Sequence, residues 1–218
     1  MKKIINITTA KHHLLQLVND LEEEIIITRD GEPVAVLAPP RPAAAAGRPV
    51  LIVLGARKCS PTASEQSIAA INRAAPLFSK LIVVYSRETE ELPARFRHPD
   101  LQAVATAKPE QPIVTSLKAG LTGCGPADEF FMFTFLSKPL PVQVFATLAA
   151  AIAAARRAGK GIIVPRRHGR PTHPLLFAGR YKANIMKTRK ELGIPHIIRR
   201  HADDIFYQDI TAAMAAAD

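Results

Sequence analysis

The spacing of apolar residues changes along the chain and divides it into two parts. Residues 4–8 read as a short strand, a helix with apolar positions three and four apart follows, and residues 25–37 form a hairpin around Asp30-Gly31. Asp-Gly suits a tight two-residue turn because both residues tolerate positive φ angles. The pattern predicts a small β-α-β-β module over residues 1–38. Such a short module buries little surface, so we expect it to need a partner chain or a docking surface.

A proline- and alanine-rich stretch, residues 39–49, is predicted to be a linker. From residue 50 onward, continuous apolar runs alternate with helical patterns. The strands are expected at 50–54, 81–85, 101–106, 130–135, 161–164 and 174–177, and the helices at 64–75, 114–121, 141–157 and 180–192. Either 197–200 or 205–207 completes the sheet. This alternation favours a three-layer, Rossmann-like α/β domain with a mainly parallel sheet over residues 50–218.

Ligands of such domains bind beyond the carboxyl ends of the strands. We therefore expect the chemistry of this chain in the segments that follow Leu54, Phe135 and Val164. The apolar strand at residues 130–135 is itself expected to belong to the core.

The net charge of +10, from 29 Lys+Arg against 19 Asp+Glu, is concentrated in one segment. Residues 151–200 hold 13 Lys or Arg and one acidic residue, a net charge of +12, which leaves −2 for the rest of the chain. A local excess of this kind predicts an anionic partner such as a nucleotide, a phosphorylated cofactor or nucleic acid. The alternative is a solvated basic face without a specific ligand.

Several classes of protein are disfavoured by composition. No apolar run reaches the ~18 residues that a membrane span needs, and the N-terminus lacks the apolar core of a secretory signal. We therefore expect a cytoplasmic protein with no membrane partner. Two cysteines, Cys59 and Cys124, are too few for a disulfide framework or a zinc cluster.

Two strings of the N-terminal module, INITTA at residues 5–10 and EIIITRDGEPVAVL at residues 24–37, resemble the Phd/YefM antitoxin family. Family members dimerise through this unit and bind operator DNA with it. The resemblance implies a homodimer through residues 1–38 or contact with DNA, and the alternative is a reused packing unit. DNA is not favoured, because residues 1–40 have a net charge of −2. The toxin-binding segment of antitoxins is replaced here by the linker and another domain.

Three strings of the second domain are similar to motifs of the MobA-like nucleotidyltransferase family, which includes the cytidylyl- and guanylyltransferases of molybdenum cofactor maturation. IVTSLKAGL contains Ser116, which the resemblance places near the nucleotide. GRPTHPLLF contains Thr172 and His173, which it places on the acceptor side. FYQDIT resembles the closing family motif, and Asp209 is its implied catalytic and metal-binding carboxylate.

Two segments depart from the family pattern where its chemistry is concentrated. The phosphate loop of the family is replaced by VLGARKCSP, in which Gly55, Arg57 and Lys58 are the implied nucleotide contacts. The Gly-Asp-x-Pro motif of the family, whose aspartate holds Mg²⁺, is replaced by LSKPL, with Ser137 at the aspartate position and Lys138 after it. A neutral serine is a poor sole anchor for Mg²⁺, which proteins hold through carboxylates.

The sequence therefore favours a nucleotidyltransferase-like protein that binds a nucleoside triphosphate or a phosphorylated small molecule. Mg²⁺ is the expected cofactor if transfer survives the loss of the aspartate. The alternative is a non-catalytic regulator that dimerises or binds DNA through the antitoxin-like module. A purely structural partner protein stays open as a third hypothesis.

Overall fold

The chain forms two compact units, residues 1–46 and 47–218. The computed structural model describes residues 3–6, 8, 9, 11, 25–37, 47–107, 110–189 and 191–215. The first unit contains a three-stranded sheet of β1 (Lys3–Asn6), β2 (Ile25–Arg29) and β3 (Glu32–Leu37). β1 is parallel to β2, and β3 is antiparallel to β2. Asp30 and Gly31 have positive φ angles at the turn, so the predicted hairpin is confirmed. The predicted helix lies almost entirely outside the described residues.

The second unit is built on an eight-stranded sheet with the order β11-β8-β10-β7-β4-β5-β6, and β9 pairs with β8. Its strands are β4 (Val50–Leu54), β5 (Lys80–Tyr85), β6 (Leu101–Ala105), β7 (Phe130–Phe135), β8 (Ile162–Arg167), β9 (Arg170–Pro171), β10 (Leu175–Ala178) and β11 (Ile205–Asp209). Along this order only β10 is antiparallel to its neighbours. The expectation of an α/β domain with a mainly parallel sheet is confirmed.

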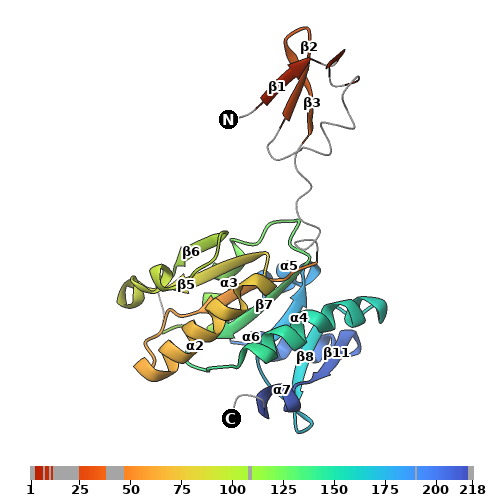
Figure 1. Ribbon diagram of the computed structural model, residues 1–218. Helices are drawn as coiled ribbons and strands as arrows, with labels where there is room; N and C mark the ends of the chain where they lie inside the picture. Colours follow the sequence, from red (N-terminus) through yellow and green to blue (C-terminus); the bar gives the residue numbers. More distant parts are fainter. Residues whose placement is uncertain are drawn as a thin grey trace. The chain divides into compact units, whose positions relative to one another are not determined.

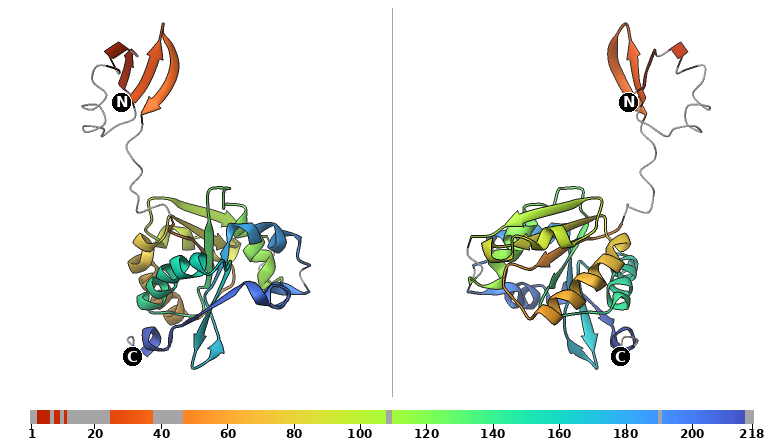
Figure 2. Two further views of the ribbon diagram at one scale, coloured as in Figure 1. Left: turned by 90° about the vertical axis from the view of Figure 1, so that its right-hand side faces the viewer. Right: turned by 60° about the vertical axis from the view of Figure 1, so that its left-hand side comes forward.

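Helices cover both faces of this sheet and complete three layers (Figure 1; Figure 2). One face carries α2 (Pro61–Ala74), α4 (Val142–Arg157) and α7 (Thr211–Ala215). The other carries α3 (Ile113–Leu121), α5 (Lys182–Lys187) and α6 (Gly193–Arg200). Short 3-10 turns lie at Ala75–Leu77, Arg87–Thr89, Leu92–Arg95, Gly179–Tyr181 and Ala202–Asp204.

The core lies between these layers. The central strands are apolar throughout because helices cover both of their faces, and residues 50–53 and 81–84 are at most 1% exposed. Gly120 brings α3 close to the sheet, since a Cβ there would lie 2.5 Å from Cγ2 of Ile52. Strand β7 also belongs to the core, as predicted, and only its last residue, Phe135, is partly exposed.

One prediction near the C-terminus is wrong, and the structure decides between the two alternatives of another. The helix expected at 180–192 begins as a 3-10 turn and ends at Lys187, because Thr188 takes an extended conformation. Residues 197–200, one of the two alternatives for the last strand, are instead part of α6, whose two buried isoleucines, Ile194 and Ile197, are three residues apart. The sheet is completed by β11, as the other alternative expected.

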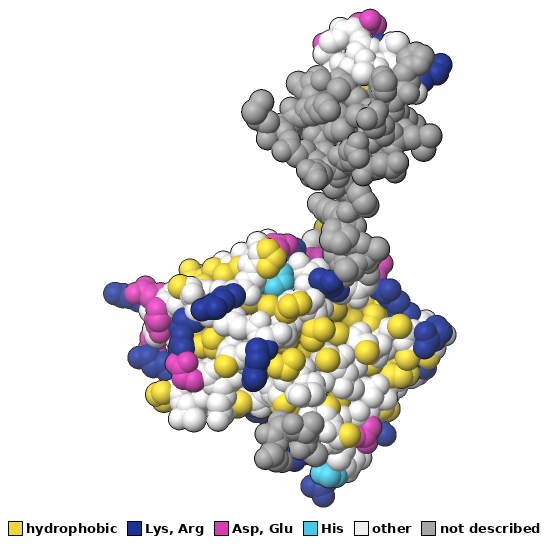
Figure 3. Space-filling view, in the orientation of Figure 1, with side chains coloured by type: hydrophobic (Ala, Val, Ile, Leu, Met, Phe, Trp, Pro, Cys, Tyr) yellow, Lys and Arg dark blue, Asp and Glu magenta, His cyan; other side chains and the backbone are white. Residues whose placement is uncertain are grey.

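The face formed by α2 and α4 mixes small apolar side chains with basic ones (Figure 3). Ala150 and Ala153 are exposed along α4, and Arg157 is exposed at its end. In the described part of the chain, no helix combines the length and the hydropathy needed to cross a bilayer.

Candidate functional site

A groove opens at the carboxyl ends of β4 and β7, which is where α/β sheets of this kind bind ligands. It has two lobes that share Ile113, the first residue of α3, and Phe135, the last residue of β7. The small lobe has a volume of about 170 Å³ and the large lobe about 550 Å³. Among the described residues, no acidic side chain lines either lobe.

The small lobe brings together four residues that the sequence singled out. Arg57 and Lys58 come from the loop after β4, Ser116 from α3, and Ser137 from the turn after β7. Ser116 is 7% exposed, whereas Ser137 is exposed. The lobe therefore presents two cations and two hydroxyl groups, a set suited to an anion.

The two cations of the small lobe have different surroundings. Arg57 Nη2 donates hydrogen bonds to the carbonyl oxygens of Glu110 and Gln111, at 3.1 Å and 2.6 Å. This guanidinium fastens the loop after β4 to the segment that precedes α3. Lys58 Nζ lies 3.8 Å from Oε2 of Glu88, and the two side chains are 70% and 62% exposed. Such an exposed ion pair contributes little, so Lys58 is able to contact a ligand.

Gly55, another predicted nucleotide contact, does not line the groove in the structure. It is buried at the end of β4, where its N–H donates to the carbonyl of Val84 at 2.9 Å. A Cβ at this position would overlap the side chain of Leu92. The absence of a side chain at Gly55 therefore permits close packing of the loop.

The large lobe has aromatic and aliphatic walls and contains the acceptor-side pair Thr172 and His173. The His173 ring lies edge-on to Phe135, with ring centroids 4.7 Å apart. Lys138 Nζ lies 5.4 Å from the centroid of the same phenyl ring. The lobe thus places one fixed positive charge beside an otherwise apolar cavity.

His173 is uncharged at neutral pH. Burial lowers its pKa to about 4, and the nearby Lys138 charge contributes to the lowering. Its Nδ1 is buried and has no hydrogen-bond partner in the described part of the chain. A neutral imidazole in this position is able to exchange one hydrogen bond with a ligand but does not supply positive charge.

Asp209 lies outside the groove lining, at the end of β11. Its Oδ1 accepts a hydrogen bond of 2.7 Å from the backbone N–H of Thr211, the first residue of α7. That hydrogen bond is the main cause of the lowered pKa of Asp209. Within the residues that the structure describes, no cluster of three His, Cys, Asp or Glu side chains is placed to hold a metal ion.

Tyr207 of the large lobe and the neighbouring Arg166 were missed by sequence reasoning. Tyr207 lines it at 43% exposure, and the guanidinium carbon of Arg166 lies 3.4 Å from the centroid of its ring. Arg166 Nε is buried without a partner among the described residues. Tyr207 belongs to the FYQDIT string on the strand beside β8, but strand periodicity does not mark it, because Ile205 on the same face is buried. Residues of α6 were also missed, since its helix was not predicted.

The fold agrees with comparisons to known proteins. Residues 66–205 match the family model of the MobA-like NTP transferase domain. The chain belongs to this family. The matched span includes Ser116, Ser137 and His173 but begins after Arg57 and Lys58. The loop that departs from the family motif therefore lies outside the matched span, as does Tyr207 of the large lobe.

Several solved structures share this fold. Rv0371c from Mycobacterium tuberculosis H37Rv has a TM-score of 0.60 and 16% identity, with coverage of 74% of this chain and 87% of that chain. 4-Diphosphocytidyl-2C-methyl-D-erythritol synthase from Anaerococcus prevotii has a TM-score of 0.56 and 11% identity, and the match covers 76% of this chain and 91% of that chain. Glucosyl-3-phosphoglycerate synthase from M. tuberculosis has a TM-score of 0.53 and 17% identity, and the match covers 77% of this chain and 70% of that chain. A search of curated proteins finds no match.

Proposed function

We propose that this MobA-like domain binds a nucleoside triphosphate or another phosphorylated small molecule in the groove, and that it does so without a metal ligand of its own. The observation that carries the proposal is the small lobe, where cations and hydroxyl groups meet at the carboxyl ends of β4 and β7 without an acidic side chain among the described lining residues. Positive charges and hydrogen-bond donors stabilise a bound anion, but they do not stabilise a bound cation.

Each residue of the groove has a role in this proposal. Lys58 contacts the phosphates, and Arg57 shapes the loop that holds them. Ser116 contacts the nucleotide from α3. Thr172 and His173 contact the acceptor in the large lobe, where aromatic walls suit a ring-containing molecule. The molybdenum-cofactor acceptor implied by the family resemblance is part of this proposal.

Two of the structures with a similar fold were solved with manganese. One structure of Rv0371c is a complex with manganese, and glucosyl-3-phosphoglycerate synthase was solved with Mn²⁺, UDP and phosphoglyceric acid. The groove described here does not fit a resident ion, because its lining offers serine hydroxyls beside Lys58 and Lys138 and no carboxylate among the described residues. The metal-binding role of Asp209 stays a prediction, and no step is assigned to it.

The replacement at Ser137 bears directly on catalysis. Nucleotidyl transfer depends on neutralising charge at the phosphate under attack, and a protein-held metal ion supplies several kcal/mol of that stabilisation. Ser137 supplies no charge, and Lys138 supplies a fixed one beside the large lobe. We therefore infer that ligand binding persists while transfer is lost.

Thermal-shift measurements test this proposal. CTP, GTP and ATP are each added to the full chain with and without Mg²⁺, and the same series is repeated with Lys58→Gln. Arg73→Gln is the matched control, because it removes one exposed positive charge from α2 outside the groove lining. Metal-independent stabilisation by a nucleotide, lost in Lys58→Gln and kept in Arg73→Gln, supports the proposal.

Two other results would contradict it. Stabilisation that requires Mg²⁺ would indicate that the groove works with a metal ion, as an active transferase would. No response to any nucleotide, together with salt-sensitive binding to duplex DNA, would favour the regulator in which residues 1–38 dimerise or contact DNA. The antitoxin-like role of that module remains a prediction.

A further inference from the structure

A second cavity lies between α5 and α6. Its volume is about 450 Å³, and it shares no lining residue with the groove. Helix α6 is a common wall: Pro195 and Ile198 line the large lobe, while His196 and Arg200 line this second cavity. His196 and Arg200 are four residues apart, so they lie on one face of the helix. We call this second space the α5–α6 cavity.

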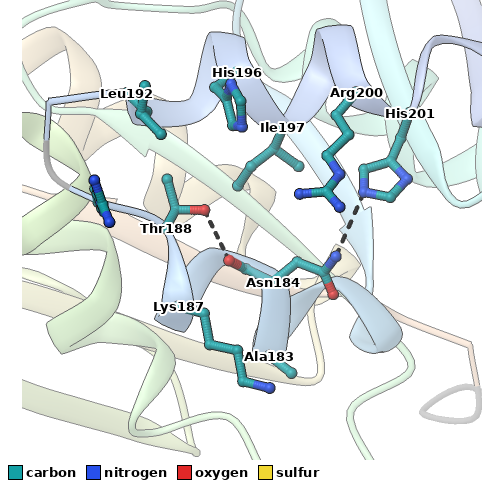
Figure 4. Close-up of a pocket in the computed structure, with 10 residues that line it drawn as sticks. Ala183, Asn184, Lys187, Thr188, Leu192, His196, Ile197, Arg200 and His201 are labelled. Atoms are coloured by element: carbon teal, nitrogen blue, oxygen red, sulfur yellow. Dashed lines mark hydrogen bonds between the residues drawn. The ribbon is translucent and has the colours of Figure 1, made fainter.

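The ionisable side chains of the α5–α6 cavity are all basic. They are three permanently charged groups and two histidines (Lys187, Arg189, Arg200, His196 and His201), with no Asp or Glu among the described lining residues. Figure 4 shows His196 and Arg200 extending from α6 toward α5. Like charges around one hollow repel each other, and an anion between them removes that repulsion.

These cations differ from two other basic residues of the same stretch, Arg156 and Arg180. Arg156 forms an ion pair with Glu129, and Arg180 Nη2 lies 2.7 Å from Oδ2 of Asp204. In contrast, none of the three permanently charged residues of the α5–α6 cavity takes part in an ion pair within the described part of the chain. Their charges are therefore not used to hold the fold together.

Hydrogen bonds fix the wall of the cavity opposite α6. Thr188 Oγ1 donates to the carbonyl of Asn184 at 2.8 Å, and Asn184 Nδ2 lies 3.4 Å from Nε2 of His201 (Figure 4). Lys118 of α3 donates to the carbonyl of Thr188 at 2.6 Å, which ties the end of α5 to the underlying helix. The polar groups are thus held in place before any ligand binds.

We propose that the α5–α6 cavity is a second anion site that binds a small molecule carrying two or more phosphate groups. Arg189 and Arg200 offer planar guanidinium groups that bind phosphate through two parallel hydrogen bonds, and Lys187 adds a point charge. The volume falls within the range of small-molecule sites. Leu192, 45% exposed at the cavity, offers an apolar contact for the remainder of the ligand.

Isothermal titration of the full chain with sodium pyrophosphate tests this site. Arg200→Gln should weaken pyrophosphate binding about 10-fold, as expected for the loss of a charge-assisted hydrogen bond. Arg199→Gln is the matched control, since Arg199 is exposed on the same helix but does not line the cavity.

Backbone amide shifts in NMR spectra locate the bound probe. Perturbations of residues 183–189 and 196–201 that are lost in Arg200→Gln and kept in Arg199→Gln support the proposal. A nucleoside diphosphate that gives the same shifts with higher affinity would identify the phosphates as those of a nucleotide, and tighter binding of pyrophosphate would identify a free polyphosphate. Both results support the site.

Three results would overturn it. One is an absence of pyrophosphate binding in a chain that still binds nucleotide in the groove. Another is equal weakening by Arg199→Gln and Arg200→Gln, because this would show diffuse attraction to a basic face. The third is a single-stranded oligonucleotide that binds more tightly than pyrophosphate and loses affinity equally in both variants. Circular dichroism of each variant checks that the fold is kept.

Discussion

Nη2 of Arg57 lies 2.6 Å from the carbonyl oxygen of Gln111, and the same nitrogen also donates to the carbonyl of Glu110. These hydrogen bonds cross the edge of the small lobe and join two segments that are more than fifty residues apart in the chain. Arg57, which the family resemblance implies as a phosphate contact, thus also positions the backbone that leads into α3.

Substitutions at Arg57 separate these two roles. Arg57→Lys keeps the positive charge, but an ammonium group cannot reproduce the geometry of the guanidinium. If positioning dominates, Arg57→Lys and Arg57→Gln should both weaken nucleotide binding by roughly 5- to 10-fold, equivalent to about one lost hydrogen bond to a charged group. Titration calorimetry with the nucleotide that stabilises the wild type measures this. Full affinity in Arg57→Lys alone would show that the charge, not the positioning, matters.

Ser137→Asp restores a carboxylate where the family holds its metal ion. We expect this variant to gain a nucleotide-dependent thermal shift that requires Mg²⁺, because a carboxylate together with the phosphates completes the usual ligand set of that ion. Ser137→Asn is the control of nearly equal size without the charge. If neither variant gains a Mg²⁺-dependent thermal shift, the neighbouring Lys138 or the altered loop after β4 is sufficient to prevent metal binding.

Much of the α/β architecture was predictable because its strands are continuous apolar runs. Residues 50–54 and 130–135 were placed correctly, since a strand covered on both faces by helices is a nearly continuous apolar run. The meeting of Lys58, Ser116 and Ser137 in one lobe also followed from the sequence. Parallel strands end at the same edge of the sheet, so segments after them converge.

The region of α5 and α6 was less predictable, because its structure depends on contacts between segments that are distant in the sequence. Residue Thr188 leaves the helical conformation while its carbonyl accepts a hydrogen bond from Lys118, seventy residues earlier in the chain. Sequence periodicity carries no sign of that partner. The consequence was an overlong helix, a missed α6, and no expectation of the cavity between the two helices.

The buried imidazole of His173 makes stability depend on pH. Its pKa in the folded chain is about 4, below the 6.5 of an unperturbed histidine. Between these two values the unfolded state binds more protons than the folded state, so stability falls as the pH drops from about 6.5 toward 4 and is constant above that window. The expected loss is about 1–2 kcal/mol once screening by water at the partly exposed ring is considered.

Urea unfolding at pH 7.5 and pH 5 measures this effect in the wild type and in His173→Gln. In His173→Gln, the free energy of unfolding should differ much less between the two pH values than it does in the wild type. His168→Asn is the control, because His168 lies in an exposed turn and has a positive φ that asparagine tolerates. An unchanged pH dependence in His173→Gln would show that another group controls it.

Asp204 should contribute to the stability of the fold rather than to metal binding. Its carboxylate accepts hydrogen bonds from Tyr181, from Arg180 and from the backbone N–H of Gly161. Burial alone would raise the pKa of Asp204, but these hydrogen bonds outweigh it and lower the pKa. The stabilisation is therefore present above the pKa of an unfolded aspartate, about 4, and is lost as the pH falls through the lower folded pKa.

Asp204→Asn removes the negative charge and turns one acceptor into a donor that faces other donors. The free energy of unfolding should fall by about 1–3 kcal/mol, the range for loss of hydrogen bonds to a charged group. Asp203→Asn is the control, since Asp203 is exposed and the bond from Lys160 goes to its backbone carbonyl. Urea unfolding at pH 7 measures both variants. If Asp204→Asn were as stable as the wild type but lost Mg²⁺-dependent nucleotide binding, Asp204 would be a metal ligand and its hydrogen bonds would be secondary.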